Sequence, residues 1–288
     1  MGLWRYILVR FLQALVVLFF VSIATFLLMH AVPGDPVNSI IGERQAERPE
    51  VRAAIESQYG LDKPLPVQYF YYVKNLVHGD MGTTITDRKD VADELRLVVP
   101  ATMELAFAAM LFALTVGIPL GIIAAVKQGK WPDHVARFLS LIGTSMPVFW
   151  LGLLLAYVLT YKFQIFPRSG QLDVGMRRPP QVTGFISIDS LLAGDTETFK
   201  SLIRHIILPA IVLGSFAMGI ISRMLRSSLV AALNDDYVRT ARAKGVSEFR
   251  VVRGHALRNA LIPTITVIGL TFASLLAGAV LTETIFSW

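Results

Sequence analysis

The chain has 288 residues, of which 54% are hydrophobic and 17% are charged, and its formal net charge is +6. A mean hydropathy of +0.57 excludes an ordinary soluble domain. The basic residues lie at the edges of apolar runs, so they indicate membrane topology and argue against nucleic-acid binding. Cysteine is absent, which excludes disulfides, thiolate metal sites and cysteine nucleophiles.

Five segments contain no Asp, Glu, Lys or Arg, and each is long enough to cross a bilayer as a helix. They are residues 11–32, 105–126, 138–161, 205–222 and 259–282. Helical runs of about 20 residues cover a hydrocarbon core of about 30 Å. We therefore predict an all-α, polytopic membrane protein with five transmembrane helices. The first is expected to be an anchor, because it is longer than a signal peptide's apolar region and no small-x-small cleavage site follows it.

The connection over residues 33–104 has the pattern of a small helical segment outside the membrane. A turn is predicted at 33–36, a short helix over 47–60 that ends at Gly60, and a second helix over 65–80. The aromatic run 69–72 fits either a grip on a ligand or partner, or an aromatic belt at the lipid headgroups. The pattern favours the belt.

Several spans contain residues that disturb a regular helix. In the second span Gly117, Pro119 and Gly121 are predicted kink and packing points, and Pro147 is one in the third. A gate hinge is the alternative interpretation of these positions. In the fourth span Pro209 is predicted near the helix start, where its missing N–H has no partner to lose. The connection that follows the third span is predicted to be a loop with a short helix at 187–193.

Two glutamates lie close to the predicted membrane boundary. Glu104 is predicted in the first turn of the second span, where a carboxylate complements the helix dipole; the alternative is recognition of a substrate ammonium. Glu283 is predicted to face the pathway or an external partner. The five histidines have no metal-ligand spacing. No Ser–His or paired-carboxylate arrangement lies inside a span, so no catalytic residue is predicted.

Basic residues are distributed unevenly between alternate connections. Residues 1–10, 127–137 and 223–258 hold 13 Lys and Arg in 57 residues, whereas the alternate connections hold 14 in 122. Because basic residues are enriched in cytoplasmic loops, the denser set is predicted to face the cytoplasm together with the N-terminus.

The last of these connections contains a basic helix pair over residues 235–260. Asn234 or Asp235 is predicted to cap a first helix that runs to Lys244, Gly245 to take left-handed dihedrals after it, and Ser247 to cap a second short helix.

The second helix of this pair is predicted to expose Phe249 and Val252 among arginines. Such a surface suits docking into another protein's groove, and it also suits contact with anionic lipid. The pattern alone leaves both interpretations open.

The sequences DYVRTARAKG at 236–245 and HALRNALIP at 255–263 strongly resemble the coupling loop of the dipeptide and oligopeptide permeases, which are membrane subunits of ATP-binding-cassette importers. The resemblance covers most of the chain. Further motifs that carry it are HAVPGDP at 30–36, YGLDKPLPVQY at 59–69, HGDMG at 78–82, ILPAIVLG at 207–214 and LTETIFSW at 281–288. The chain is most similar to the first, B-type permease subunit of a dipeptide importer, and glutathione and nickel permeases are also similar.

This resemblance implies a type I importer permease fold in a bacterial inner membrane. The implied partners are a homologous second permease subunit, two ATPase subunits, an extracytoplasmic peptide-binding protein and membrane lipid. The residues implied to couple to the ATPase are Arg239, Thr240, Ala241, Arg242, Ala243, Lys244, Gly245 and Phe249. Residues 239–241 read Arg-Thr-Ala where the general permease motif has Glu-Ala-Ala, so no glutamate role is carried over.

ATP and Mg²⁺ are expected in the partner subunits and no cofactor in this chain, because it lacks a Gly-x-x-x-x-Gly-Lys-Ser/Thr phosphate loop. We therefore predict that the chain is not an enzyme. Members of the resembling family continue into a sixth span, so we expect a chain that stops at Trp288 to be incompletely represented.

The predicted organisation is an N-terminal span (1–32), the external segment (33–104) and a permease core (105–288). A self-sufficient secondary transporter should carry charges in the middle of its spans. The spans of this chain have none, so this alternative is less favoured. A membrane scaffold is another alternative, but it leaves the capped helix pair without a purpose.

Overall fold

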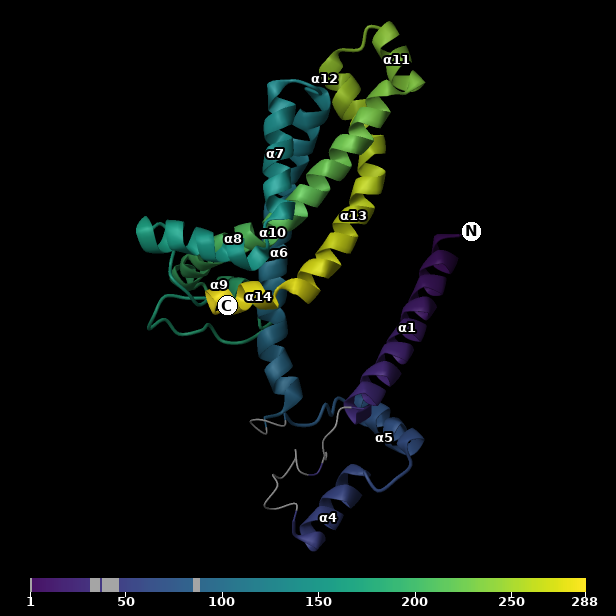
Figure 1. Cartoon of the computed structure of the whole chain (residues 1–288), viewed down its shortest axis with the longest axis vertical. Coiled ribbons are helices and arrows are strands. Elements are labelled where there is room, and N and C mark those ends of the chain that lie inside the picture. Colours follow the sequence, from purple (N-terminus) through teal and green to yellow (C-terminus); the bar gives the residue numbers. More distant parts are fainter. Residues whose placement is uncertain (1, 32–36, 38–46, 85–88) are drawn as a thin grey trace. The chain divides into compact units, whose positions relative to one another are not determined.

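The computed structural model describes residues 2–31, 37, 47–84 and 89–288, and the chain divides into two compact units, Met1–Leu95 and Arg96–Trp288. Regular structure in these ranges is helical, apart from one isolated antiparallel bridge between Thr83 and Asp90 (Figure 1). The prediction of an all-α protein is therefore confirmed for the described residues.

The N-terminal unit contains α1 (Leu3–Ala31), α4 (Pro49–Tyr59) and α5 (Leu65–Val77). Pro49 opens α4, where its fixed φ suits the first turn, and Gly60 ends it with a φ of +67°. The predicted helix ending at Gly60 is thus confirmed, and α5 occupies most of the predicted 65–80 helix. The turn predicted at 33–36 lies outside the described residues.

Helix α5 packs against the second half of α1 through part of the aromatic run. The Tyr69 hydroxyl lies 2.8 Å from Ser22 Oγ, and the Tyr69 ring meets the buried Phe26 ring edge-on at 5.4 Å between centroids. The Tyr72 ring lies 5.9 Å from the same Phe26, whereas Phe70 is exposed. Two members of the run therefore hold helices together, a role that neither the belt nor the ligand interpretation included.

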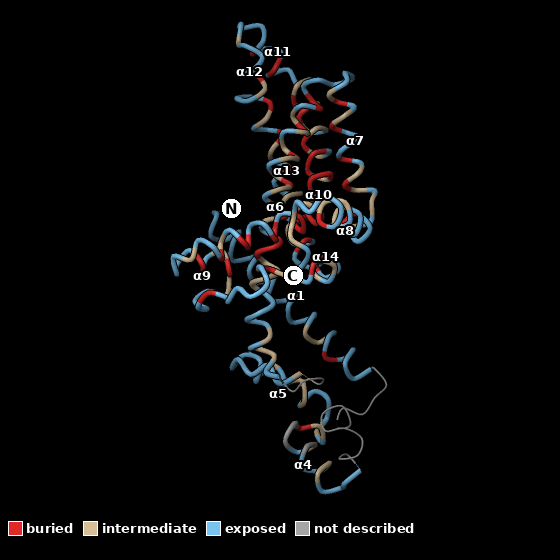
Figure 2. The backbone as a smooth tube through the Cα atoms, turned by 90° about the vertical axis from the view of Figure 1, so that its left-hand side faces the viewer, coloured by how far each residue is buried: buried red, intermediate tan, exposed pale blue. Residues whose placement is uncertain are grey.

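The C-terminal unit is a helical bundle. Its elements, with α6 beginning just before the unit boundary, are α6 (Val91–Val126), α7 (Trp131–Ser145), α8 (Val148–Leu155), the π-helix η1 (Ala156–Lys162), α9 (Ile186–Leu192), α10 (Thr196–Asn234), α11 (Asp236–Ala243), α12 (Glu248–Arg250), the π-helix η2 (Val251–Ala256), α13 (Leu257–Gly278) and α14 (Val280–Phe286). Helix α10 packs along both α7 and α13, and in Figure 2 the buried residues gather in this part of the bundle.

Four helices of the described chain are long and apolar enough to cross a membrane: α1, α6, α10 and the continuous helix Glu248–Gly278. The remaining predicted span corresponds to α7 followed by Val148–Lys162, and these two pieces are bent by 107° where Pro147 separates them. The predicted kink at Pro147 is confirmed. The five predicted spans therefore correspond to four continuous helices and one bent pair.

Helices α6 and α10 begin well before their charge-free runs, and this corrects two predictions. Asp195 caps α10 by accepting a backbone hydrogen bond, so Pro209 lies inside the helix and not near its start. Glu104 likewise lies inside α6 and not in its first turn. The reason is the same in both cases: polar residues outside the apolar run continue the helical hydrogen-bond pattern, because only the membrane-buried part needs to be apolar.

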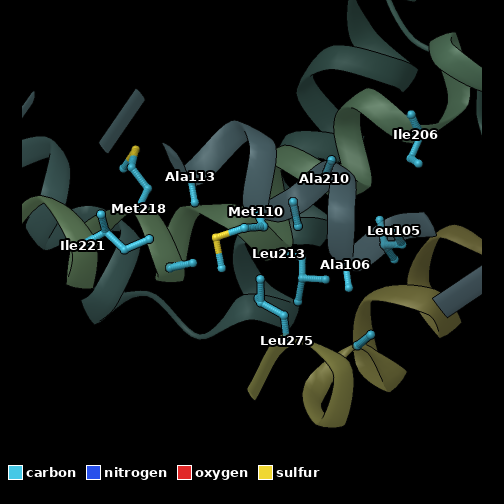
Figure 3. Close-up of a cluster of buried hydrophobic side chains, with 13 residues drawn as sticks. Leu105, Ala106, Met110, Ala113, Ile206, Ala210, Leu213, Met218, Ile221 and Leu275 are labelled. Atoms are coloured by element: carbon cyan, nitrogen blue, oxygen red, sulfur yellow. The ribbon is translucent and has the colours of Figure 1, made fainter. Parts of the chain in front are cut away.

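Small residues let α10 approach its neighbours closely. A Cβ atom at Gly143 of α7 would overlap the carbonyl oxygen of Ser215. On α10 itself, Cβ atoms at Gly214 and Gly219 would overlap carbonyl oxygens of α6 and α7. Backbone therefore meets backbone at these crossings, as is typical of membrane helix interfaces. Figure 3 shows the core beside them, which includes Ala106 and Ala113 of α6 and Ala210 and Leu213 of α10.

The glycines predicted as packing points in the second span have this role. Cβ atoms at Gly117 and Gly121 would lie 3.0 Å and 2.9 Å from the carbonyl oxygens of Met218 and Ser222. Helix α6 continues through Pro119 without interruption. The packing interpretation is confirmed for both glycines.

Candidate coupling surface

The predicted helix pair is a short helix, α11, followed by a turn and a long helix. Asp235 stands at the N-cap of α11 in an extended conformation, but its side chain makes no capping hydrogen bond. Lys244 ends the helix, as predicted. Gly245 has a φ of +76°, a conformation that only glycine adopts without strain. Ser247 stands at the N-cap of α12, although its side chain makes no capping hydrogen bond.

The second helix of the pair is not short, so that part of the prediction is wrong. Helix α12 continues through η2 into α13, and together they form a 31-residue helix, Glu248–Gly278. Gly254 lies in the π-helical stretch Val251–Ala256, and the helix continues through it. The turn at Gly245 therefore connects α11 directly to a membrane span.

One face of α11 is anchored in the bundle. Val238 is fully buried and Ala241 is nearly so, and both belong to a cluster that includes Leu229 of α10 and Val251 of η2. Ala241, one of the predicted coupling residues, thus points into the protein. Its role in the fold is to seat α11, because burying apolar area is the main favourable contribution such a short helix receives.

The opposite face of α11 is exposed and basic. The side chains of Arg239, Thr240, Ala243 and Lys244 are exposed there, and so is Gly245. Arg239 makes a long ion pair of 3.3 Å with an aspartate that is itself almost fully exposed. Such a pair contributes little in water, so this face keeps its positive character.

A bidentate ion pair clamps the turn. Arg242 Nε donates to Glu248 Oε2 at 3.0 Å, and its Nη2 donates to Oε1 at 2.6 Å. These hydrogen bonds raise the pKa of Arg242 above its ordinary value. Fork-to-fork geometry fixes direction as well as distance, so the last turn of α11 is tied to the first turn of α12 across Gly245. Phe249, the next predicted coupling residue, is 71% exposed and faces residues of α6.

A buried ion cluster lies at the same end of the bundle and was not predicted. Asp133 is 1% exposed, and its two carboxylate oxygens accept hydrogen bonds from Arg226 Nε at 2.8 Å and Nη2 at 2.9 Å. The Gly129 N–H donates to the same carboxylate at 2.9 Å, and Arg137 pairs with it at 3.2 Å. The cluster joins the start of α7 to α10. Nothing in the sequence pointed to a partner 93 residues away.

At the other end of the unit, both predicted glutamates make contacts between elements. Glu104 is 6% exposed, and its Oε1 accepts a hydrogen bond of 2.7 Å from the Ser187 N–H at the start of α9. Its Oε2 is buried and finds no hydrogen-bond partner among the described residues. Glu283 accepts a hydrogen bond of 2.5 Å from the Thr102 hydroxyl. Their contact with a substrate or an external partner stays a prediction.

The connection between η1 and α10 is organised by Asp189 of α9. Its buried carboxylate accepts hydrogen bonds from the N–H groups of Val182, Thr183 and Gly184 and from the Thr183 hydroxyl, at 2.8–3.2 Å. Burial alone would raise the pKa of Asp189, but these donors hold it below its ordinary value. The predicted short helix at 187–193 corresponds to α9.

Comparison with known families agrees with this architecture. Residues 117–288 match the family described as the binding-protein-dependent transport system inner membrane component, and residues 3–106 match the N-terminal part of such membrane components. The chain belongs to this family. It is therefore a membrane-embedded transport permease of the inner membrane and not an enzyme, and the predicted resemblance is confirmed.

Individual relatives carry more specific names. The chain is 50% identical over 280 residues to the di/tripeptide transport system permease protein of Pseudomonas aeruginosa (strain UCBPP-PA14). This match covers 97% of the chain and 83% of the relative. It is 46% identical over 268 residues to the probable D,D-dipeptide transport system permease protein of Escherichia coli (strain K12), covering 93% and 78%. A glutathione transport system permease protein of Escherichia coli O6:H1 is 37% identical over 285 residues, covering 99% and 83%.

Proposed function

We propose that this chain is the B-type permease subunit of an ATP-driven importer of dipeptides and other short peptides. It contributes half of the translocation pathway and works with a homologous second permease, two ATPase subunits and an extracytoplasmic peptide-binding protein. The names of the dipeptide and di/tripeptide relatives support this substrate class. The lower identity to the glutathione permease supports it over that alternative.

The arrangement of the C-terminal unit supports the proposed orientation. The start of α7, the end of α10 and α11 lie at one end of this unit, whereas α9 and α14 lie at the other (Figure 1). The first end carries the densely basic connections 127–137 and 223–258. Because cytoplasmic loops are enriched in Lys and Arg, this end and the N-terminus of the chain are proposed to face the cytoplasm.

The anchored helix α11 carries the proposal of coupling to an ATPase. Its exposed basic face is available to another protein, and its buried face and the Arg242–Glu248 clamp connect it to α10 and to the span that begins at Glu248. A force on α11 would therefore reach two membrane helices. Nucleotide chemistry belongs to the partner, and this chain's part is to seat in it and to move.

The test is a substitution at the turn. Gly245→Val places a β-branched residue at a φ of +76°, where left-handed backbone costs about 1–2 kcal/mol before the branched side chain adds to it. We expect the assembled transporter in liposomes to lose peptide uptake while it still hydrolyses ATP, with normal membrane insertion. Gly254→Ala is the matched control, since Gly254 has free space and no positive φ.

Two results would contradict the proposal. Uptake by Gly245→Val equal to that of the parent would remove the coupling role of the turn. A chain that purifies in mild detergent without any ATPase subunit, and transports peptide alone, would remove the whole assembly.

A further inference from the structure

An apolar groove lies beside the turn, between the end of α6, the start of α7 and the first turns of the long helix from Glu248. Its volume is about 600 Å³, within the range of about 300–1,000 Å³ that is usual for sites of small molecules. Ile123 is 44% exposed and Phe249 is 71% exposed. Its apolar walls are formed by Ile122, Ile123, Val126, Pro132, Phe249 and Val252.

The rim of this groove is cationic. Lys127 and Arg253 line it, both are exposed, and neither makes an ion pair within the part of the chain that the structure describes. The Arg253 guanidinium lies 6.0 Å from the centre of the Phe249 ring. Glu248 also lines the groove, but both of its carboxylate oxygens are held by Arg242. The positive charge at the rim is therefore not neutralised.

The groove lies at the boundary of the membrane. Ile122, Ile123 and Val126 belong to the charge-free run 105–126, and Lys127 is the first charge after it. Trp131, 77% exposed, stands beside the groove residue Pro132. Tryptophan and lysine next to an apolar run are typical of the headgroup level.

We propose that this groove binds an anionic phospholipid of the bilayer, with an acyl chain against Ile123, Val126 and Phe249 and the headgroup phosphate on Lys127 and Arg253. A soluble anion would leave the apolar walls in water, and a zwitterionic lipid would bring no net charge to the two cations. A soluble protein would have to reach residues of the membrane-buried run. An anionic amphiphile satisfies the walls and the rim together.

The inference gives Phe249 a role different from the one expected from the resemblance. The exposed face of α11 is free to contact an ATPase, while Phe249 and Arg253 contact lipid at the start of the adjoining span. The lipid site does not depend on whether α11 couples to an ATPase, so the two ideas are tested separately.

Native mass spectrometry of the purified transporter tests the site. The protein is titrated with phosphatidylglycerol and, in parallel, with phosphatidylcholine of the same acyl chains. Because a basic residue near anionic lipid contributes about fivefold to binding, the double variant Lys127→Ala/Arg253→Ala should bind phosphatidylglycerol roughly 30-fold more weakly. Lys130→Ala is the matched control, because this exposed lysine lies in the same connection but does not line the groove.

A second variant separates the acyl chain from the headgroup. Val252→Trp fills the groove and leaves both cations in place, and this variant should also abolish binding of phosphatidylglycerol. Ile123→Trp is used instead if Val252→Trp does not fold. Thermal unfolding without added lipid checks folding in each case. Equal retention of phosphatidylcholine, full binding by the groove-filling variant, or displacement by millimolar inorganic phosphate would overturn the lipid assignment. Lipid that is bound by the permease subunits alone but is absent from the complete transporter would also overturn it, in favour of a protein occupant.

Discussion

Replacing Asp133 by alanine should destabilise the bundle strongly. The carboxylate is 1% exposed and accepts two hydrogen bonds from Arg226 and one from the Gly129 N–H. Removing one partner of a buried pair costs about 3–5 kcal/mol, because the remaining charge is left buried and unpaired. The Arg226 side chain is 24% exposed, so water partly solvates its charge. We therefore expect a loss of stability at the lower end of this range, about 3 kcal/mol. For a unit of this size that corresponds to a fall in Tm of roughly 6–12 °C.

A double-mutant cycle isolates the pair. Asp133→Ala, Arg226→Met and the double variant are purified in the same detergent, and their thermal unfolding is followed by circular dichroism. The double variant should be more stable than the sum of the single losses predicts, by at least about 1.5 kcal/mol of coupling. Strictly additive losses would show that the two residues act independently and would refute the reasoning, whatever the size of the single effects.

Three further predictions concern packing, pH and the N-terminal unit. Gly143→Ala should lower the melting temperature clearly, because its methyl group meets backbone of α10, whereas Gly269→Ala, with open space around it, should not. Asp189 has a pKa below its ordinary value of 3.8, so its stabilising effect is complete above that pH and is lost as the pH falls through the lower folded-state value. Proteolysis of the 182–184 loop should therefore increase only in acid, and Asp189→Asn should make it rapid at neutral pH. Tyr69→Phe removes the hydrogen bond with Ser22 and should cost about 1 kcal/mol, measured by hydrogen exchange in α5.

The sequence predicted which helices are long and apolar enough to cross a membrane better than it predicted where those helices begin. The length of a charge-free run reflects the thickness of the hydrocarbon core, but the helical hydrogen-bond pattern continues beyond that core. This is why Glu104 and Pro209 were assigned to helix starts and lie inside α6 and α10. Local signals were accurate where one residue determines the backbone, as at Gly60, Pro147 and Gly245.

Contacts between distant residues were beyond the reach of a single sequence. Asp133 and Arg226 are each ordinary residues at the ends of apolar runs, and only the crossing of α7 and α10 brings them together. The same holds for Phe249, whose apolar character was recognised while the α6 residues opposite it were not. The presence of a helix could be predicted from the local sequence pattern, but the partners of each helix face depend on the packing of the whole bundle.

The close glycine crossings of α10 have a mechanical consequence. This helix has 39 residues without a break, so at 1.5 Å per residue it is a rod of about 58 Å. Gly214 and Gly219, where its backbone touches α6 and α7, lie near the middle of the rod and form a natural fulcrum. A tilt of roughly 5° about that point displaces the tip that bears α11, about 29 Å away, by about 2.5 Å. Motion imposed on that tip is thus passed to the crossings with α6 and α7.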